Sequence, residues 1–279
     1  MEEGFPVVEE QLKGFLGVGL KVHGRLDGTL QRDGELTPDA VGKALGKDIA
    51  NYYATPEVVE QRPPALCQGC GHRDMYQALN DVLAEYEGAK VFGDIGCYTL
   101  GALPPFRAID SCIDMGASIT MAKGASDAGV YPAVSVIGDS TFTHSGMTGL
   151  ATIAYNQSNS TVIIVDNSIT GMTGHQQNPT TGKNLYGEPA GRVNLEALVK
   201  AMGINRVVVV DPYDIAECEK VIKEELAAEE PSVIISRRPC ALLKEVKPLP
   251  PLKVNEDKCK SCKMCMKIGC PAISMKNNK

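Results

Sequence analysis

The sequence predicts an α/β protein with a doubly wound, mostly parallel sheet, and two observations lead to this prediction. Short β-branched runs alternate with helical segments between residues 63 and 246, a pattern typical of strands joined by crossover helices. Two of the runs, 133–137 and 161–165, are almost wholly apolar and are followed at once by polar residues. Such runs are typical of parallel strands that are buried on both faces.

Each further element is predicted from its own stretch of sequence. Residues 75–86 carry apolar side chains at three- and four-residue steps and are followed by Gly88, a common helix stop. The small residues of 114–128 suit a helix that packs closely, and helix 145–157 would join the two buried strands. The remaining elements are strands at 90–92, near Ile109, at 206–210 and at 232–236, and helices at 193–202 and 213–228.

Length and charge limit what the chain can be. Its 279 residues suffice for one large or two small domains with a buried core. The net charge of −6 offers no basic surface for nucleic acid. No apolar run approaches the roughly 20 residues that a membrane span needs, and Met1-Glu2-Glu3 does not resemble a signal peptide. We therefore expect a cytoplasmic protein with no membrane and no nucleic-acid partner.

Three parts are expected along the chain. Residues 1–62 carry glycine-rich stretches and one short predicted helix, 40–45, and are predicted to be an N-terminal extension or linker from an upstream domain. Residues 63–246 form the main α/β domain. The proline-rich stretch 247–251 opens the last part, residues 247–279, which is too short to fold without a covalent or metal staple.

Polar side chains at the ends of the two buried strands predict a metal site. Asp139 follows the first strand and Asn167 the second, and ligands of open α/β sheets bind beyond the carboxyl ends of the strands. Carboxylate and amide oxygens suit a Mg²⁺ ion that is shared with a phosphate. The N-terminus of helix 145–157 is expected at the same place, where unpaired N–H groups suit a diphosphate. The alternative is two ordinary strand ends of a doubly wound fold.

The residues around this site carry a family resemblance. Gly138-Asp139-Ser140-Thr141-Phe142, followed by Asn167 and by Met172-Thr173-Gly174-His175-Gln176, resembles the α subunits of indolepyruvate:ferredoxin oxidoreductases, within the 2-oxoacid:ferredoxin oxidoreductases. The resemblance covers nearly the whole chain. It implies the thiamin diphosphate-binding fold for the main domain, with thiamine diphosphate (TPP) and Mg²⁺ as cofactors.

The resemblance also implies roles for individual residues. Asp139, Asn167 and the backbone carbonyl of Ile169 would bind Mg²⁺. Among the histidines, His144 is the favoured catalytic candidate, because it occupies the strand-to-helix turn that faces the site and could shuttle a proton. The other residues expected at the cofactor are Met115, Gly116, Ala117, Ser118, Gly138, Ser140, Thr141, Gly171, Met172, Thr173 and His72. For the segment 115–118 the alternative is a helix that simply packs tightly on the sheet.

Four cysteines near the end of the sequence give the strongest metal signal. They are spaced Cys-x2-Cys-x2-Cys-x4-Cys-Pro and are Cys259, Cys262, Cys265 and Cys270. Bacterial ferredoxins bind 4Fe-4S clusters with a similar run, in which the last gap is three residues rather than four. We therefore expect a partial ferredoxin-like iron–sulfur module at residues 247–279, with zinc as the alternative.

A second group of cysteines lies in the main domain. Cys67 and Cys70 form a Cys-x2-Cys pair, which alone fits zinc, a redox pair or cluster ligands. The family resemblance implies that they hold a 4Fe-4S cluster near the TPP together with Cys97 and Cys240, each of which follows a predicted strand. Two further cysteines are expected to be buried as small apolar residues, namely Cys112 and Cys218.

The resemblance implies a reaction and its partners. The reaction would be TPP-dependent oxidative decarboxylation of aryl 2-oxo acids of the indolepyruvate type to acyl-CoA, with electrons passed through 4Fe-4S clusters to ferredoxin. The chain offers no candidate for the glutamate that activates the cofactor in this family. An upstream pyrimidine-binding (PYR-type) domain or subunit would supply it, and a β subunit would complete an oligomeric enzyme. The alternatives are a non-oxidative TPP-dependent decarboxylase, similar to sulfopyruvate decarboxylase, and a non-catalytic electron-transfer fragment.

Overall fold

The computed structural model describes residues 7–15, 21–48, 57–58, 64–247, 250 and 252–275, and the chain divides into two compact units, residues 1–62 and 63–279. In the first unit, helix α1 spans Val7–Phe15 and helix α2 spans Pro38–Ala44. The hydroxyl of Thr37 accepts the Ala40 N–H at 3.3 Å, so α2 begins with a side-chain cap.

The second unit is built on a six-stranded sheet in the order β2-β1-β3-β4-β6-β5. All strand pairings among the described residues are parallel, which confirms the predicted parallel α/β sheet. The strands are β1 Lys90–Gly93, β2 Ser111–Cys112, β3 Ala133–Gly138, β4 Thr161–Asp166, β5 Arg206–Val210 and β6 Ser232–Arg237.

The strand expected near Ile109 forms slightly later, as the two-residue strand β2. The side chain of Ile109 is buried against the backbone of Gly93, where an added Cβ atom would lie 2.8 Å from Ile109 Cδ1. The ladder with β1 forms at Ser111 and Cys112. The apolar residue therefore marks core packing, while the first backbone hydrogen bond to β1 is made by the N–H of Asp110, to the Val91 carbonyl at 2.9 Å.

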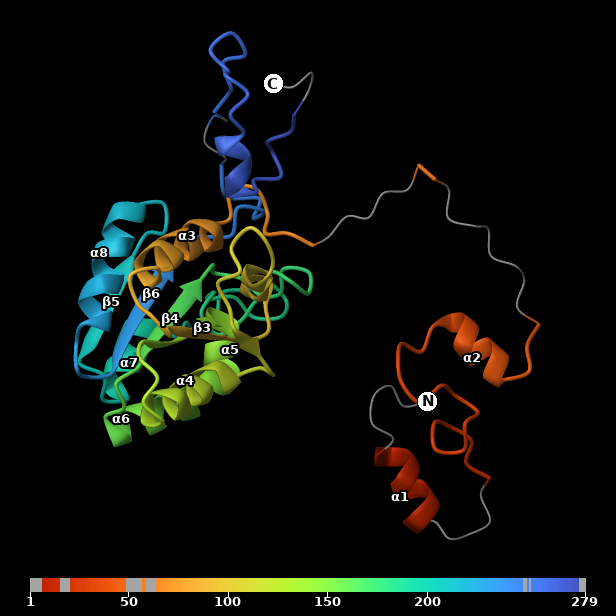
Figure 1. The fold of residues 1–279 in the computed structure, drawn as a ribbon. Coiled ribbons are helices and arrows are strands. Elements are labelled where there is room, and N and C mark those ends of the chain that lie inside the picture. The colour runs from red at the N-terminus through yellow and green to blue at the C-terminus, as the bar shows by residue number, and fades with distance from the viewer. Residues whose placement is uncertain are drawn as a thin grey trace. The chain divides into compact units, whose positions relative to one another are not determined.

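Helices cover both faces of the sheet (Figure 1). Helices α3 and α8 share one hydrophobic cluster with the strands, and helices α4, α6 and α7 share the other. This arrangement of two helical layers is what a doubly wound sheet requires. The helices are α3 Gly71–Leu83, α4 Ala117–Asp127, α6 Met147–Asn156, α7 Leu195–Ala201 and α8 Ile215–Leu226.

Alternate residues of strand β4 point to opposite layers. Ile163 and Val165 belong to the cluster with α3 and α8, whereas Val162 and Ile164 belong to the cluster with α4, α6 and α7. Each of these side chains is fully buried. Complete burial of one such side chain contributes about 1.5–3 kcal/mol, so the apolar run that predicted this strand also fixes it between both layers.

The helix after β3 begins earlier than the predicted range of 145–157. Helical backbone starts with α5 at Asp139–Thr141, continues as a π-helical turn, η2, at Phe142–Gly146, and runs on into α6. A π turn interrupts the 3.6-residue period, so apolar spacing did not reveal this start. Asp139 is consequently the first helical residue rather than part of a loop.

The last part of the chain has little regular structure. Between residues 252 and 275 the structure describes one 3-10 helix, η3 at Met264–Ile268, and no strand. Pro248, Leu249 and Pro251 of the expected linker lie outside the described residues, and the ferredoxin-like module stays a prediction. Of the helices in the described ranges, none combines the length and apolar character needed to cross a membrane.

Candidate functional site

The strand order creates a switch point between β1 and β3. From β1 the chain continues to β2 on one side, whereas from β3 it continues to β4 on the other side. Ligands of open α/β sheets bind at such a point. A pocket of about 110 Å³ lies there, and we call it the switch-point pocket. Its lining includes Ile95, Gly96, Cys97 and Tyr98 after β1, and Gly138, Asp139, Ser140 and Thr141 at the end of β3 and after it.

The switch-point pocket brings together most of the residues predicted at the cofactor. Gly138 of β3 pairs with Val165 of β4, so Asp139 and Asn167 leave neighbouring strands at the same edge of the sheet. The three predicted Mg²⁺ ligands, which include Ile169, all line this pocket. It is also lined by the predicted residues His72, Met115, Gly171, Met172 and Thr173.

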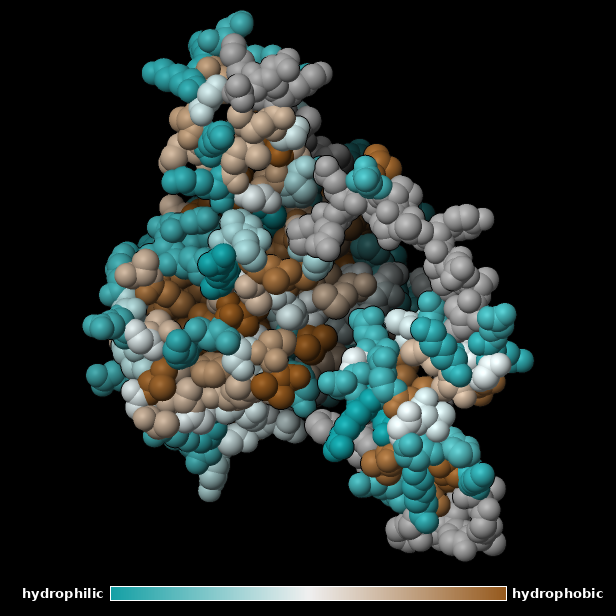
Figure 2. Space-filling model, turned by 45° about the vertical axis from the view of Figure 1, so that its right-hand side comes forward, coloured by the Kyte–Doolittle hydropathy of each residue, from teal (hydrophilic) through white to brown (hydrophobic). Residues whose placement is uncertain are grey.

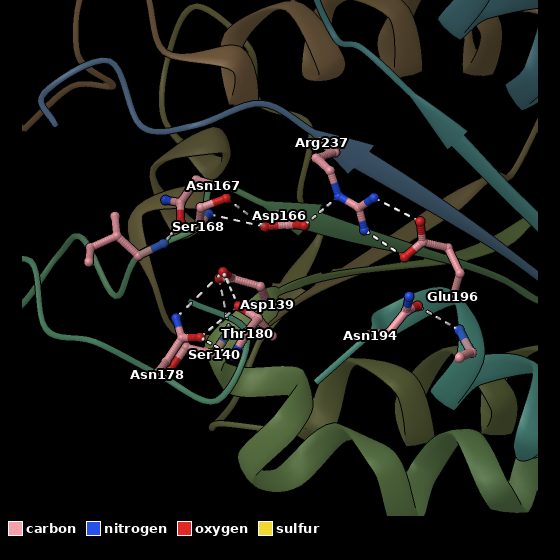
Figure 3. Close-up of polar contacts among 12 residues, drawn as sticks. Asp139, Ser140, Asp166, Asn167, Ser168, Asn178, Thr180, Asn194, Glu196 and Arg237 are labelled. Atoms are coloured by element: carbon pink, nitrogen blue, oxygen red, sulfur yellow. Dashed lines mark hydrogen bonds and ion pairs between the residues drawn. The ribbon is translucent and has the colours of Figure 1, made fainter. Parts of the chain in front are cut away.

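Asp139 is a buried carboxylate that has no cationic partner in the described part of the chain. Its Oδ2 accepts hydrogen bonds from Thr180 Oγ1 at 3.1 Å and Asn178 Nδ2 at 3.5 Å (Figure 3). Burial, and next the nearby charge of Asp166, raise the pKa of Asp139 to about 7. No ion pair among the described residues involves Asp139. A bound cation would therefore offset the cost of burying this charge.

The neighbouring acid, Asp166, is paired instead with an arginine. Arg237 Nε donates to Asp166 Oδ2 at 2.7 Å, and the other two guanidinium nitrogens donate to both carboxylate oxygens of Glu196 at 2.8 Å (Figure 3). Asp166 Oδ1 also accepts the Ser168 N–H at 3.0 Å, in a turn where Ser168 has a φ of +59°. The ion pair thus fixes the start of the loop that carries Asn167.

The loop after β4 supplies oxygen atoms to the pocket. Asn167 Oδ1 accepts the Ile169 N–H at 3.2 Å, which closes a local turn. Thr170 Oγ1 donates to Ser140 Oγ at 2.9 Å and so joins this loop to the helix that starts at Asp139. Hard oxygen donors of this kind fit a Mg²⁺ ion that is shared with a diphosphate. No group of three or more His, Cys, Asp or Glu side chains in the described part of the chain could hold a metal alone, and the predicted site has only one carboxylate.

Asp94, a buried acid that the sequence reasoning missed, holds a second helix start near the pocket. Its carboxylate accepts the Gly116 N–H at 2.8 Å and the Ser118 N–H at 3.2 Å. Gly116 has a φ of +96°, and an added Cβ atom would lie 2.9 Å from Ser145, so glycine is needed there. Met115 lines the pocket, whereas Gly116, Ala117 and Ser118 form the capped start of α4. The available signal was the Gly-Asp pair found at the end of both β1 and β3, where the glycine is the last strand residue and the aspartate follows it.

Tyr98 lines the switch-point pocket and was not predicted to do so. Its side chain is buried, and its hydroxyl donates to the Ile95 carbonyl at 3.1 Å. The ring packs on Gly138, where an added Cβ atom would lie 2.6 Å from Tyr98 Cε1. Tyr98 belongs to the 3-10 helix η1, Cys97–Ala102. Glycine at position 138 thus leaves the room that this ring occupies.

The histidines differ in their relation to the pocket. His72 is buried in its lining, and burial lowers the pKa of His72 to about 4, so the ring is neutral at neutral pH. His144 is exposed on the π-helical turn, and the described lining of the pocket does not include it. The catalytic role of His144 therefore stays a prediction.

A second pocket, of about 270 Å³, contains the predicted cysteines of the main domain, and we call it the cysteine pocket. Its lining includes Cys67, Cys70, Cys97 and Cys240. The structure thus gathers the four thiols that the family resemblance grouped. Five residues line both pockets, which therefore share a wall: His72, Cys97, Asn167, Gly171 and Met172.

The environment of these thiols favours their protonated form, and in the described residues no three of them are placed to hold a metal ion as they stand. Burial, with smaller contributions from neighbouring thiols, raises the pKa of Cys70 to about 12. Burial also raises the pKa of Cys97, as do the charges of Cys240 and Cys67. All four cysteines are free. Because iron–sulfur clusters bind thiolates, assembly of a cluster here would release protons.

The remaining cysteines lie elsewhere. Cys218 is fully buried as expected, whereas Cys112 is only half-buried. In the tail, Cys262 and Cys265 are exposed, and Cys259 and Cys270 are half-buried. An iron–sulfur cluster in the tail thus stays a prediction that depends on spacing.

Large hydrophobic side chains are exposed at the switch-point pocket. Met115 and Met172, which line the pocket, are 50% and 48% exposed. Figure 2 shows hydrophobic side chains exposed among hydrophilic ones on one face of the molecule. Exposed apolar groups that gather at a pocket often mark a binding surface.

A parallel α/β sheet whose switch point combines a buried acid, an amide and a helix N-terminus defines a domain of the class that binds diphosphate-containing cofactors. Residues 94–236 match the family model described as "Thiamine pyrophosphate enzyme, C-terminal TPP binding domain". The match extends over half of the chain, and the chain belongs to this family of TPP enzymes.

Curated relatives agree with the family. The chain is 40% identical to indolepyruvate oxidoreductase subunit IorA of Pyrococcus abyssi, over 98% of this chain and 47% of the relative. It is 39% identical to the IorA subunit of Methanothermobacter marburgensis, over 92% of this chain and 43% of the relative. The resemblance seen in the sequence motifs is therefore confirmed. The chain spans about half the length of the curated relatives that it matches.

A solved structure supports the fold. It is a 2-oxoglutarate:ferredoxin oxidoreductase from Magnetococcus marinus with 2-oxoglutarate, coenzyme A and succinyl-CoA bound. The TM-score is 0.57 at 22% sequence identity, with 67% of this chain and 68% of that chain covered.

Proposed function

We propose that this chain is the TPP-binding part of an oxidoreductase that decarboxylates aryl 2-oxo acids of the indolepyruvate type to acyl-CoA, with ferredoxin as the electron acceptor. The observation that carries the proposal is the wall shared by the switch-point pocket and the cysteine pocket. A cofactor site beside four thiols suits a reaction whose electrons leave through an iron–sulfur cluster. The identity to IorA subunits of indolepyruvate oxidoreductases supports the substrate class.

The oxygen groups of the switch-point pocket would hold the cofactor. The carboxylate of Asp139, the side-chain oxygen of Asn167 and the carbonyl of Ile169 would bind Mg²⁺, because all three line the pocket and the buried carboxylate has no other cationic partner among the described residues. The helix that starts at Asp139 would direct the N–H groups of its first turn to the diphosphate. When bound, TPP supplies the carbanion chemistry by which a 2-oxo acid loses CO₂.

The two histidines would have different tasks. His72 is neutral and buried in the wall between the pockets, so it can orient a polar group there without adding charge. His144 is exposed in the second turn of the helical segment that starts at Asp139. We retain His144 as the proposed proton shuttle for the substrate.

The cysteines favour an oxidative reaction over simple decarboxylation, because the release of CO₂ alone requires no path for electrons. The four thiols of the cysteine pocket would hold one 4Fe-4S cluster. A second cluster would form in the ferredoxin-like tail, with Cys259, Cys262, Cys265 and Cys270 as its ligands.

Other chains or domains would complete the enzyme. An upstream PYR-type domain would supply the activating glutamate, and coenzyme A and a β subunit would take part in the complete, oligomeric, cytoplasmic enzyme. The relatives are about twice as long as this chain, which supports an additional domain. The exposed Met115 and Met172 are available for a partner that closes over the pocket.

Reconstitution tests this proposal. The full chain is loaded anaerobically with iron and sulfide, mixed with the upstream half and with the β subunit of an IorA-type enzyme, and assayed for viologen reduction that depends on indolepyruvate and coenzyme A. We expect reduction with the unaltered chain and none with a Cys97→Ser variant. A different result would support the non-oxidative decarboxylase instead. In that case, mixtures without iron release CO₂, and mixtures loaded with iron do not reduce viologen.

A further inference from the structure

The loop between β4 and α7 displays two large hydrophobic side chains. Leu185 is 89% exposed and Tyr186 is 84% exposed, so nothing in the described part of the chain covers them. Single hydrophobic side chains are common on protein surfaces. A leucine next to a tyrosine, both almost fully exposed in one loop, is not explained by packing within the domain. We call residues 182–190, which carry this pair, the loop tip.

The loop tip is held in one conformation by its own hydrogen bonds. The side-chain oxygen of Asn184 accepts the N–H of Tyr186 at 2.9 Å and that of Glu188 at 3.0 Å. The N–H of Asn184 donates to the Glu188 carbonyl at 2.9 Å, and Lys183 and Pro189 form an antiparallel bridge across the tip. A loop that is ordered before it binds loses little conformational entropy on binding. The two hydrophobic side chains are therefore presented to a partner at low entropic cost.

The base of the same loop is fixed to the switch-point pocket. Thr180 is 2% exposed and donates to Asp139 Oδ2 at 3.1 Å, and Asn178 Nδ2 donates to the same oxygen at 3.5 Å (Figure 3). Leu185 follows Thr180 by five residues. Because a fully extended residue spans at most about 3.6 Å, the Cα atoms of these two residues are at most about 18 Å apart. The loop tip is thus tethered close to the proposed metal ligand.

This position suits a protein surface that closes over the switch-point pocket. In the proposed function the upstream half supplies the activating glutamate, so its surface must pack over the carboxyl edge of the sheet. A standard protein interface covers about 800 Å² of each partner, which corresponds to a patch roughly 30 Å across. Such a patch is wide enough to cover both the switch-point pocket and the loop tip. Tyrosine, with its apolar ring and its hydroxyl, is also among the side chains that contribute most to interfaces.

We propose that the loop tip docks into an apolar recess of the upstream half, with Leu185 and Tyr186 as the side chains that enter the recess. The tip also carries Lys183 and Glu188, both exposed and opposite in charge, so it presents no net charge and fits an uncharged recess. The choice of the upstream half as the partner rests on the proposed function. The exposure and the rigidity of the tip are properties of this chain alone.

Titration of the full chain with the folded upstream half of an IorA-type relative tests the docking, and this calorimetric measurement needs neither TPP nor iron. We expect the double variant Leu185→Ser, Tyr186→Ser to raise the dissociation constant by about tenfold or more. Tyr155→Ser is the matched control and should bind like the unaltered chain. Tyr155 is 88% exposed and lies in α6, six residues before β4 begins, and so at the opposite edge of the sheet (Figure 1). The unfolding midpoint should be the same in all variants, because the substituted side chains are exposed.

The other outcomes are distinct. Undiminished binding of the double variant would overturn the docking and leave the proposed function in place. No binding by the unaltered chain would contradict both the docking and the partner that the proposed function names. Sedimentation of the chain alone completes the test. Self-association that the double variant abolishes would show that a second copy of this chain covers the tip, and would overturn the choice of the upstream half.

Discussion

The backbone N–H of Cys240 donates to the backbone carbonyl of Asn167 at 2.9 Å. Asn167 lines the switch-point pocket and Cys240 lines the cysteine pocket, so one main-chain hydrogen bond joins the two sites. Arg237, in β6, reaches back to Asp166 and strengthens the same junction. The loop that carries Asn167 and the segment that carries Cys240 are therefore connected where they leave β4 and β6.

Asp139→Ala should abolish Mg²⁺-dependent TPP binding while leaving the fold intact. The affinity should fall by more than about 100-fold, because loss of a supporting residue around a metal ligand already costs 10–100-fold. The free energy of unfolding should change by about 1 kcal/mol or less, since the cost of burying a carboxylate is removed along with its three hydrogen bonds, from Ser140, Asn178 and Thr180. Isothermal titration and urea unfolding measure these effects. The control Asp81→Ala, on an exposed helix surface, should bind normally, and undiminished affinity in Asp139→Ala would contradict the assignment.

Gly138→Ala should narrow the switch-point pocket. The new methyl group would meet Tyr98 Cε1 at 2.6 Å, and forcing a buried ring to move costs about 1–3 kcal/mol. We expect a loss of unfolding free energy in this range together with weaker TPP binding. Gly124→Ala, where an added Cβ atom meets nothing within 4 Å, should instead raise stability by about 0.5–1 kcal/mol. Equal effects of the two substitutions on TPP binding would refute the steric explanation.

The sequence predicted the strands, and the placement of Asp139 and Asn167 at one pocket, because both depend on local signals. The run 161–165 is apolar and β-branched because β4 is buried on both faces, and Asp139 and Asn167 follow their strands directly. Parallel pairing then brings these two residues to one edge. Once β3 and β4 are taken as neighbouring parallel strands, Asp139 and Asn167 are predicted to lie close together.

The parts that were missed depend on contacts distant in sequence or on irregular backbone. Asn178 and Thr180 contact Asp139 from about 40 positions further along the sequence, and this contact could not be predicted from residue spacing. The position of Tyr98 in the pocket depends on the space beside Gly138, which has no side chain to fill it. The π turn at Phe142–Gly146 has no sequence period of its own.

Glu196→Gln should lose a stabilisation that depends on pH. Hydrogen bonds from Arg237 lower the pKa of Glu196 from 4.5 to about 2. Because the unfolded chain then binds this proton more readily, the stabilisation is present above pH 4.5 and is lost as the pH falls towards 2. The side chain is 32% exposed, so we expect a difference of only about 1–2 kcal/mol at pH 6. Urea unfolding of both proteins from pH 7 to pH 3 should show the difference shrinking below pH 4.5, and a constant difference would argue against the ion pair as its source.

Cys97→Ser and Cys259→Ser should separate the two proposed clusters. Cys97 lines the cysteine pocket and Cys259 lies in the tail, so each substitution should remove one cluster signal and about half of the bound iron. Iron and sulfide assays with paramagnetic resonance spectra of the reconstituted chain measure this. Cys112→Ser, outside both groups, is the control and should keep all of the iron. Loss of every signal in either variant would mean that the clusters do not assemble independently.

Diffraction at the iron absorption edge, from anaerobic crystals of the loaded chain grown with TPP and Mg²⁺, tests the central claim most directly. We predict an anomalous iron peak enclosed by Cys67, Cys70, Cys97 and Cys240, with density for Mg²⁺ against Asp139 and Asn167 across the shared wall. An iron peak away from the cysteine pocket, or TPP bound without contact to Asp139, would contradict the account.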